Sequence, residues 1–303
     1  MKSRGKGYGL VEAVCFLINE NPQERSEKGR TSKPSSPNTE RANKTGVNTL
    51  SPLSQKPAPI GSTPPIFEKE PPQPRQPISL PIRNKDNNRV IAYLQSRGID
   101  RDLILDCINC GILYESRNYH NAVFLGKDEH GKTHFAAMRS TNTRFMRDAD
   151  GSDKNYGFVL LPNNPVGGAG VVVSPFLVTA VAIYESPIDC LSHQTLCEQG
   201  YIPPFDGWRL SLGGTSLGAL EQFLLRHPQI THCLVCTDND EAGDKVAVKI
   251  ADMLMGASAN VEAGANVGIA KRNITFERSP PIHGKDWNDT LQAMKKAERT
   301  VAN

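Results

Sequence analysis

Apolar runs alternate with amphipathic segments along the second half of the chain. Residues 176–184 (FLVTAVAIY) are continuously apolar and rich in β-branched side chains, which indicates a strand buried on both faces. Residues 231–237 (THCLVCT) predict a second buried strand. Two further strands and three helices are expected around these runs: strands at 208–212 and 273–278, and helices at 187–199, 217–226 and 242–255. This alternation favours an α/β fold, with a parallel four-stranded sheet covered by helices on both faces.

The preceding segment has shorter elements. Its pattern predicts two helices, at 90–97 and 101–109. Two strands are expected after them, at 121–125 and 134–139, joined by a polar hairpin at 128–132. We therefore expect a small α+β domain over residues 89–165, followed by the larger α/β domain over residues 170–293.

The first part of the chain has few apolar clusters. Residues 25–88 contain 12 of the 22 prolines and many Ser, Thr, Asn and Gln residues. Such a segment buries too little apolar surface to offset the entropy of ordering it, so we predict a disordered linker. Ahead of the linker, residues 9–19 are expected to form a short amphipathic helix.

Carboxylates directly follow the two long apolar runs. Glu185 follows the first run, and Asp238 and Asp240 follow the second. Because the carboxyl ends of parallel strands meet at one edge of a sheet, we expect these side chains to lie together. Neighbouring carboxylates repel one another unless a cation neutralises them, and hard oxygen ligands suit Mg²⁺ or Mn²⁺. The pattern therefore predicts a divalent metal site.

Most acidic residues of this region also have a structural explanation. Asp189 completes a capping box with Ser186, and Pro187 stands at the first position of that helix. Four other carboxylates could have a structural role at a helix end instead of binding metal: Glu185, Asp240, Asp286 and Asp289.

Taken in order, these motifs resemble the Toprim domain of bacterial primases, topoisomerases and related nucleases and recombination proteins, over residues 171–291. The likeness is tighter to primases, because residues 185–189 (ESPID), 212–215 (LGGT) and 285–289 (KDWND) resemble primase motifs. Residues 122–156 follow the order of the primase subdomain that precedes Toprim. The chain is most similar to Toprim proteins with an uncharacterised preceding domain, of the kind found on plasmids and conjugative elements.

The N-terminal segment adds to this resemblance. Residues 5–13 resemble the tail of a primase-type zinc ribbon, although the Cys and His ligands of the ribbon are absent. We therefore interpret residues 1–24 as a short helical remnant of such a region. A helix that docks on the core, or a start-site artefact, is the alternative.

The resemblance implies magnesium-dependent phosphoryl transfer on nucleic acid, in replication or transfer of mobile-element DNA. In this interpretation Asp238 and Asp240 hold the metal with help from Asp286, and Glu185 is a further ligand or the general acid/base. Single-stranded DNA is the expected partner, together with a relaxase or a helicase. Two other functions remain open: a Toprim nuclease, and a non-catalytic DNA-binding accessory protein of a mobile element.

Four side chains are expected to contact nucleic acid or a nucleotide: Arg139, Lys154, Asp189 and Lys285. Arg139 and Lys154 belong to a group of cations within residues 139–154. Such cations suit phosphate contacts, whereas the alternative is solvated charge paired with the aspartates of the same loop.

Net charge and the distribution of apolar residues indicate which partners and which cellular location to expect. The chain has a net charge of +3, and by count residues 1–88 carry +6, so the remainder carries −3. A basic arm on an acidic body fits weak attraction to phosphate. No apolar run is long enough to span a membrane and no signal peptide is evident, so a cytoplasmic location without a membrane partner is expected.

The seven cysteines form an odd number, and we expect them to be reduced. Two pairs have the spacing of zinc ligands, Cys107/Cys110 and Cys233/Cys236. The second pair would lie on opposite faces of a strand, and the first would close a helix, so no zinc is expected.

Overall fold

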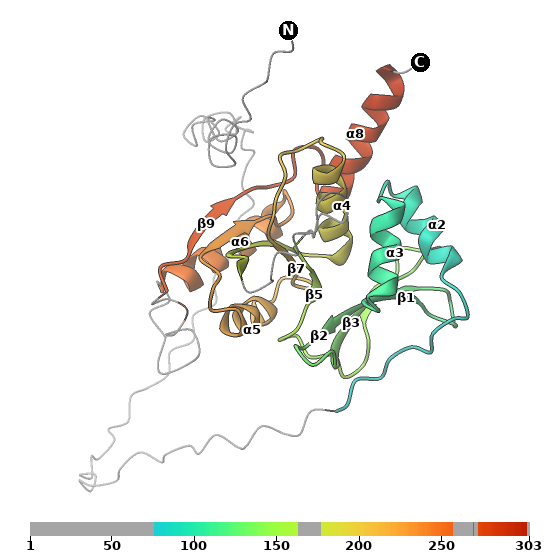
Figure 1. Ribbon diagram of the computed structural model, residues 1–303, viewed down its shortest axis with the longest axis horizontal. Helices are drawn as coiled ribbons and strands as arrows, with labels where there is room; N and C mark the ends of the chain where they lie inside the picture. Colours follow the sequence, from blue (N-terminus) through green and yellow to red (C-terminus); the bar gives the residue numbers. More distant parts are fainter. Residues whose placement is uncertain (1–75, 163–176, 257–268, 270–271, 302–303) are drawn as a thin grey trace, which may run out of the picture. The chain divides into compact units, whose positions relative to one another are not determined.

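The computed structural model describes residues 76–162, 177–256, 269 and 272–301, and we refer to these as the described residues. The predicted N-terminal remnant and most of the predicted linker lie outside them. The described residues contain two sheets, one of four strands and one of five (Figure 1). They include no helix with the length and apolar character needed to cross a membrane.

The small domain pairs two helices with an antiparallel sheet. The helices are α2 (Asn88–Ser96) and α3 (Arg101–Asn109), and the sheet order is β1-β2-β3-β4. The strands are β1 (Leu113–Glu115), β2 (Ala122–Lys127), β3 (Thr133–Arg139) and β4 (Met146–Asp148). The two helices and the two central strands were predicted. Strands β1 and β4 have three residues each, too few to show an alternating pattern in sequence.

The larger sheet has the order β5-β7-β6-β8-β9. Its strands are β5 (Phe158–Leu160), β6 (Ala180–Tyr184), β7 (Trp208–Ser211), β8 (His232–Val235) and β9 (Thr275–Arg278). Strands β7, β6, β8 and β9 pair in parallel, which confirms the predicted four-stranded sheet. Strand β5 is an addition, because it pairs antiparallel with β7 and so joins the larger sheet rather than the small domain to which we assigned it.

Four helices of the described residues cover this sheet: α4 (Pro187–Glu198), α5 (Gly218–Arg226), α6 (Glu241–Met255) and α8 (Trp287–Val301). Side chains of β6 alternate between two cores. Ala182 and Tyr184 belong to one core with residues of α4 and α8, and Val181 and Ile183 belong to the other with residues of α5 and α6. Both faces are therefore buried, as the continuous apolar run predicted. Cys236 and Cys233 likewise belong to different cores.

The segment ahead of α2 lies against the small sheet. The N–H of Ser79 donates to Asp150 O at 2.8 Å, the N–H of Asn84 donates to Glu115 O at 2.8 Å, and Arg83 forms a bridge with Ser116. The prediction of a disordered linker is therefore wrong for residues 76–88. Main-chain hydrogen bonds to the sheet order this segment, and apolar patterning does not reveal such bonds.

α4 carries a buried histidine. His193 is 3 % exposed and packs edge-on against the rings of Tyr184, Phe205 and Trp287. Its Nδ1 accepts a hydrogen bond of 3.3 Å from Nε of Arg209, which is itself fully buried. Burial, and secondarily the Arg209 guanidinium, hold the pKa of His193 well below its usual range.

We expect His193 to make folding sensitive to acid. Its pKa is lower in the folded chain than in the unfolded chain, so its contribution to stability is fully present above the unfolded pKa and is lost as the pH falls through that value. Between pH 7.5 and pH 5.5 the loss is about 1.4 kcal/mol for an unfolded pKa of about 6.5. His193→Asn, whose Oδ1 can still accept from Arg209, should remove this part of the pH dependence in urea titrations.

The control is His130→Asn, because the His130 side chain is 83 % exposed. It should leave the pH dependence of the unfolding free energy unchanged. The same difference between pH 7.5 and pH 5.5 in His193→Asn and the parent would contradict the prediction, whatever the absolute stability of the variant.

Candidate active site

Glu185 and Asp238 meet where two neighbouring parallel strands end. Glu185 directly follows β6, and Asp238 lies three residues beyond the end of β8. The main-chain N–H of Asp238 donates to Oε1 of Glu185 at 3.1 Å. The structure therefore brings both carboxylates to the carboxyl edge of the larger sheet.

Several carboxylates act on Asp238 at once. Its side chain is 15 % exposed. Burial first, and then the negative charges of Asp189, Glu185 and Asp286, raise its pKa to about 8. Burial also raises the pKa of Glu185, and the charge of Asp240 adds to that effect. Glu185 and Asp238 thus share one electrostatic environment, which disfavours the negative charge of both side chains.

Asp240 has two roles at this edge. Its Oδ1 accepts the N–H of Gly243 at 2.9 Å, so it is the N-cap of α6, as the structural alternative proposed. Its Oδ2 lies 2.8 Å from Nζ of Lys285, and the same Nζ lies 3.7 Å from Oδ2 of Asp238. The Lys285 hydrogen bond, followed by the Gly243 hydrogen bond, lowers the pKa of Asp240. The Lys285 ammonium group therefore lies beside both Asp238 and Asp240.

The loop before α8 holds Lys285 in this place. The N–H of Asn239 donates to the Lys285 carbonyl at 2.7 Å, and the N–H of Lys285 donates to Oδ2 of Asp289 at 2.9 Å. Gly284 has a φ of +74°, and a Cβ there would lie 2.4 Å from Cβ of Asp289. Glycine is therefore needed for this turn.

Asp286 begins the last helix. Its Oδ1 accepts the N–H of Asp289 at 2.7 Å, as a helix-starting residue does. Trp287 follows it as a buried anchor, 2 % exposed, and donates from Nε1 to the carbonyl of Cys236 at 3.0 Å. The structural alternative for Asp286 holds, and its charge still raises the pKa of both Asp189 and Asp238.

Asp189 lies beneath the surface of the site. Ser186 is the N-cap of α4, and its Oγ accepts the N–H of Asp189 at 3.4 Å, as the predicted capping box requires. The Ser186 hydroxyl also donates to Oδ2 of Asp189 at 2.6 Å. Burial, and then the charge of Asp286, raise the pKa of Asp189 to about 7. Asp189 is only 4 % exposed, so little of its surface is available to nucleic acid. Its contact with nucleic acid stays a prediction, which this burial does not favour.

The two predicted cations of the small domain lie far apart. Lys154 donates from Nζ to the carbonyl of Gly213 at 3.0 Å, in the glycine turn after β7, and forms an ion pair with Asp148. A Cβ on Gly213 would meet the ring of Phe135, so the start of β3 also faces this turn. Arg139 lies four residues beyond Phe135 on the same strand, which places the two residues about 13 Å apart along β3. The structure does not bring Arg139 to the carboxylates.

Arg278, at the end of β9, is a site residue that the sequence analysis missed. It donates from Nη1 to the carbonyl of Thr237 at 2.7 Å and from Nη2 to that of Asp238 at 2.8 Å. The guanidinium therefore fixes the main chain that presents the Asp238 side chain. Its place at the end of the last predicted strand was the only signal available.

The carboxylate oxygens at this edge of the sheet suit a hard divalent cation. The described residues contain no group of three Asp, Glu, His or Cys side chains already arranged around one point to hold a metal. The available donors are carboxylate oxygens that repel one another, and the Lys285 ammonium already stands as a cation against Asp238 and Asp240. Oxygen donors of this kind suit Mg²⁺ or Mn²⁺.

Two family descriptions match the chain. "Protein of unknown function (DUF3991)" matches residues 92–164, and "Toprim-like" matches residues 182–291. No curated protein matches significantly.

Several solved primase structures resemble the fold. The primase fragment of the bacteriophage T7 primase-helicase is 16 % identical, with 68 % of this chain and 71 % of that chain covered and a TM-score of 0.40. The primase catalytic core of E. coli is 13 % identical, with 72 % and 73 % covered and a TM-score of 0.41. A DNA primase domain from Pseudomonas aeruginosa is 17 % identical, with 70 % of each chain covered and a TM-score of 0.37.

Proposed function

This chain is a Toprim-domain protein whose Toprim-like region follows a DUF3991 domain, and we propose that it performs metal-dependent phosphoryl transfer on nucleic acid in the manner of a primase. The observation that carries the proposal is the gathering of Glu185, Asp238 and Asp240 at the carboxyl edge of the parallel sheet, with a cation drawn against the two aspartates. Ligands of open α/β sheets bind at this edge.

We assign each site residue a role from its position. Asp238 and Asp240 would hold Mg²⁺ or Mn²⁺, and Asp286 would support them from the start of α8. A cation bound there neutralises phosphate charge and favours in-line attack by an oxygen nucleophile. Glu185, partly buried beside Asp238, is the residue we assign to proton transfer or to further ligation. We assign phosphate binding to Lys154, which is 45 % exposed beside the glycine turn.

The substrate and setting are further parts of the proposal. We assign single-stranded DNA as the template, a relaxase or a helicase as the partner, and replication or transfer of a mobile element as the process. The test measures dinucleotide synthesis from nucleoside triphosphates on a single-stranded template, and cleavage of a labelled oligonucleotide, each with Mg²⁺, Mn²⁺ or EDTA. We expect a synthesis product that requires metal. Cleavage without synthesis would favour a Toprim nuclease instead.

One observation favours a non-catalytic alternative. The Lys285 ammonium already neutralises charge on Asp240 and approaches Asp238, so the carboxylate edge is stabilised by the chain itself. A DNA-binding accessory protein would need no more than this. It predicts oligonucleotide binding that EDTA does not change, with no product in either assay.

A further inference from the structure

We propose that the end of the small sheet away from the carboxylates is a docking surface for single-stranded nucleic acid. We call it the distal surface, and it consists of the β1–β2 loop (116–121), the β3–β4 loop (140–145) and the adjoining strand ends. The inference rests on the proposed function in one respect, that the substrate is nucleic acid.

The two loops are neighbours in space. Arg139, the last residue of β3, pairs with Ala122, the first residue of β2. The Thr141 hydroxyl donates to the carbonyl of His120 at 3.1 Å, which ties one loop to the other. The far ends of β2 and β3 face the larger sheet, since a Cβ on Gly126 would meet the carbonyl of Gly157. The distal surface is therefore separate from the Toprim carboxylates.

Large apolar side chains stand in solvent on this surface. Tyr119 is 83 % exposed, Met146 is 64 % exposed and Phe145 is 47 % exposed. Exposed aromatic rings are the usual platforms on which unpaired bases stack, and each stacked base contributes substantially to affinity.

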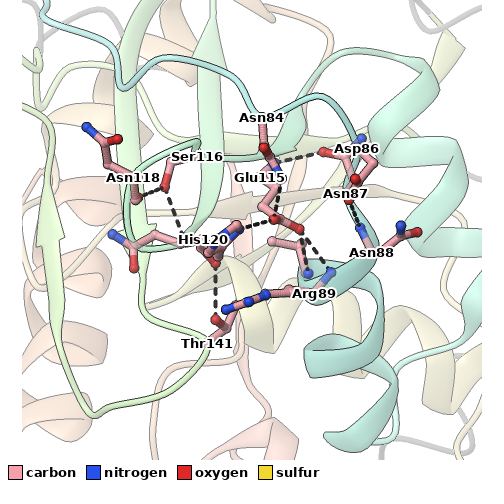
Figure 2. A network of polar contacts seen from close by, with 12 residues as sticks. Asn84, Asp86, Asn87, Asn88, Arg89, Glu115, Ser116, Asn118, His120 and Thr141 are labelled. Carbon is pink, nitrogen blue, oxygen red and sulfur yellow. Dashed lines mark hydrogen bonds and ion pairs between the residues drawn. The ribbon is translucent and has the colours of Figure 1, made fainter.

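A buried carboxylate fixes the loop that presents Tyr119 (Figure 2). The Glu115 side chain is fully buried, and its Oε1 lies 2.5 Å from Nδ1 of His120 and accepts from Nδ2 of Asn84 at 2.7 Å. Its Oε2 accepts the N–H groups of Arg89 and Val90 at the start of α2.

The loop itself adopts an uncommon backbone. Tyr119 and His120 have φ angles of 65° and 53°, in the left-handed region that glycine favours. Two such residues in succession are held in place by the Glu115 hydrogen bonds to the rest of the loop and to α2. Tyr119 is thereby directed outward while the backbone beneath it is anchored.

The charges on the distal surface are positive and unpaired. Arg117 and Arg144 are exposed and Arg139 is partly exposed, and none of the three forms an ion pair with a carboxylate of the described residues. Arg139 instead turns Nη1 toward the Met146 sulfur at 3.4 Å. Guanidinium groups bind phosphates and stack on bases, so this surface complements a polyanion with accessible bases. Only single strands offer both features together, because a duplex keeps its bases in the stack.

The test measures binding of a fluorescein-labelled oligothymidylate of about 16 nucleotides by fluorescence polarisation. EDTA is present throughout, so that the carboxylate edge cannot contribute through a metal. We expect Tyr119→Ala to weaken binding about tenfold, and Tyr119→Phe, which keeps the ring, to bind as the parent does. The Arg117→Ala/Arg144→Ala double variant should bind more weakly and reduce the slope of log K against log salt by about 0.7 for each phosphate that the protein no longer neutralises. Arg101→Ala, an exposed arginine on α3, is the matched control and should bind as the parent does.

The outcomes separate this inference from the proposed function. If the parent binds the oligonucleotide and Tyr119→Ala and the double arginine variant bind equally well, the distal surface is not the docking site, and the proposed function stands. If the parent binds no single strand in EDTA, the distal surface is not a docking site, and the synthesis and cleavage assays with metal decide the proposed function separately. Weakening by Tyr119→Phe equal to that by Tyr119→Ala would show that stacking is not the mode of binding.

Discussion

Replacing Asp238 with asparagine should abolish metal-dependent phosphoryl transfer, with a loss of about a thousandfold or more. The change keeps the size of the side chain and removes one negative oxygen donor from the carboxylate edge. The main-chain contacts of residue 238 to Glu185 and Arg278 do not involve its side chain and should persist. The fold of the variant should therefore match that of the parent, and the loss should be specific to metal binding and chemistry.

Stability measurements make this prediction sharper. Burial and like charges already oppose ionisation of Asp238, so the variant in EDTA should be as stable as the parent or slightly more stable. In the parent, Mg²⁺ at about a hundredfold excess over its Kd should add about 2.7 kcal/mol to the free energy of unfolding. Asp238→Asn should lose most of that gain in thermal and urea melts with and without Mg²⁺.

Asp252→Asn is the matched control, because it makes the same change of charge near the far end of α6. It should keep both the activity and the metal-induced stabilisation of the parent. A metal-induced shift in Asp238→Asn equal to that of the parent would remove Asp238 from the site, and the accessory-protein alternative would then be preferred.

Much of the larger domain was predictable because its central strands, β6 and β8, are buried on both faces. Such strands appear in sequence as continuous apolar runs, and the residues that follow them must lie at one edge of a parallel sheet. The capping box at Ser186 and Asp189 was equally visible, because its spacing is local. The family matches confirm the Toprim resemblance and the uncharacterised domain before it.

The remaining features depend on contacts between distant parts of the chain. Strand β5 has three residues and is defined by its pairing with β7. Arg278 reaches carbonyls 40 and 41 residues away, and residues 76–88 are ordered by main-chain bonds to the small sheet. The burial of Asp189 follows from how α4 packs, which a capping motif alone does not determine.

Lys285 shows how such a distant contact alters the predicted site. The sequence suggested that Lys285 contacts a nucleotide, whereas the structure places its ammonium 2.8 Å from Asp240 and 3.7 Å from Asp238. From this position it competes directly with any cation that these aspartates bind. Because its side chain is 61 % exposed, it can swing into solvent at little cost and release both carboxylates.

We therefore expect Lys285→Gln to bind Mg²⁺ about tenfold more tightly than the parent, which corresponds to about 1.4 kcal/mol. In EDTA the variant should be less stable than the parent by no more than about 1 kcal/mol, because the ion pair is exposed to solvent. Calorimetric Mg²⁺ titration and melts in EDTA measure the two effects separately.

Lys245→Gln is the matched control, since it breaks an exposed ion pair with Glu241 on α6, and it should leave Mg²⁺ affinity unchanged. Weaker Mg²⁺ binding by Lys285→Gln would mean that Lys285 supports the metal site rather than competing for it, and that the aspartates need this lysine to hold their arrangement.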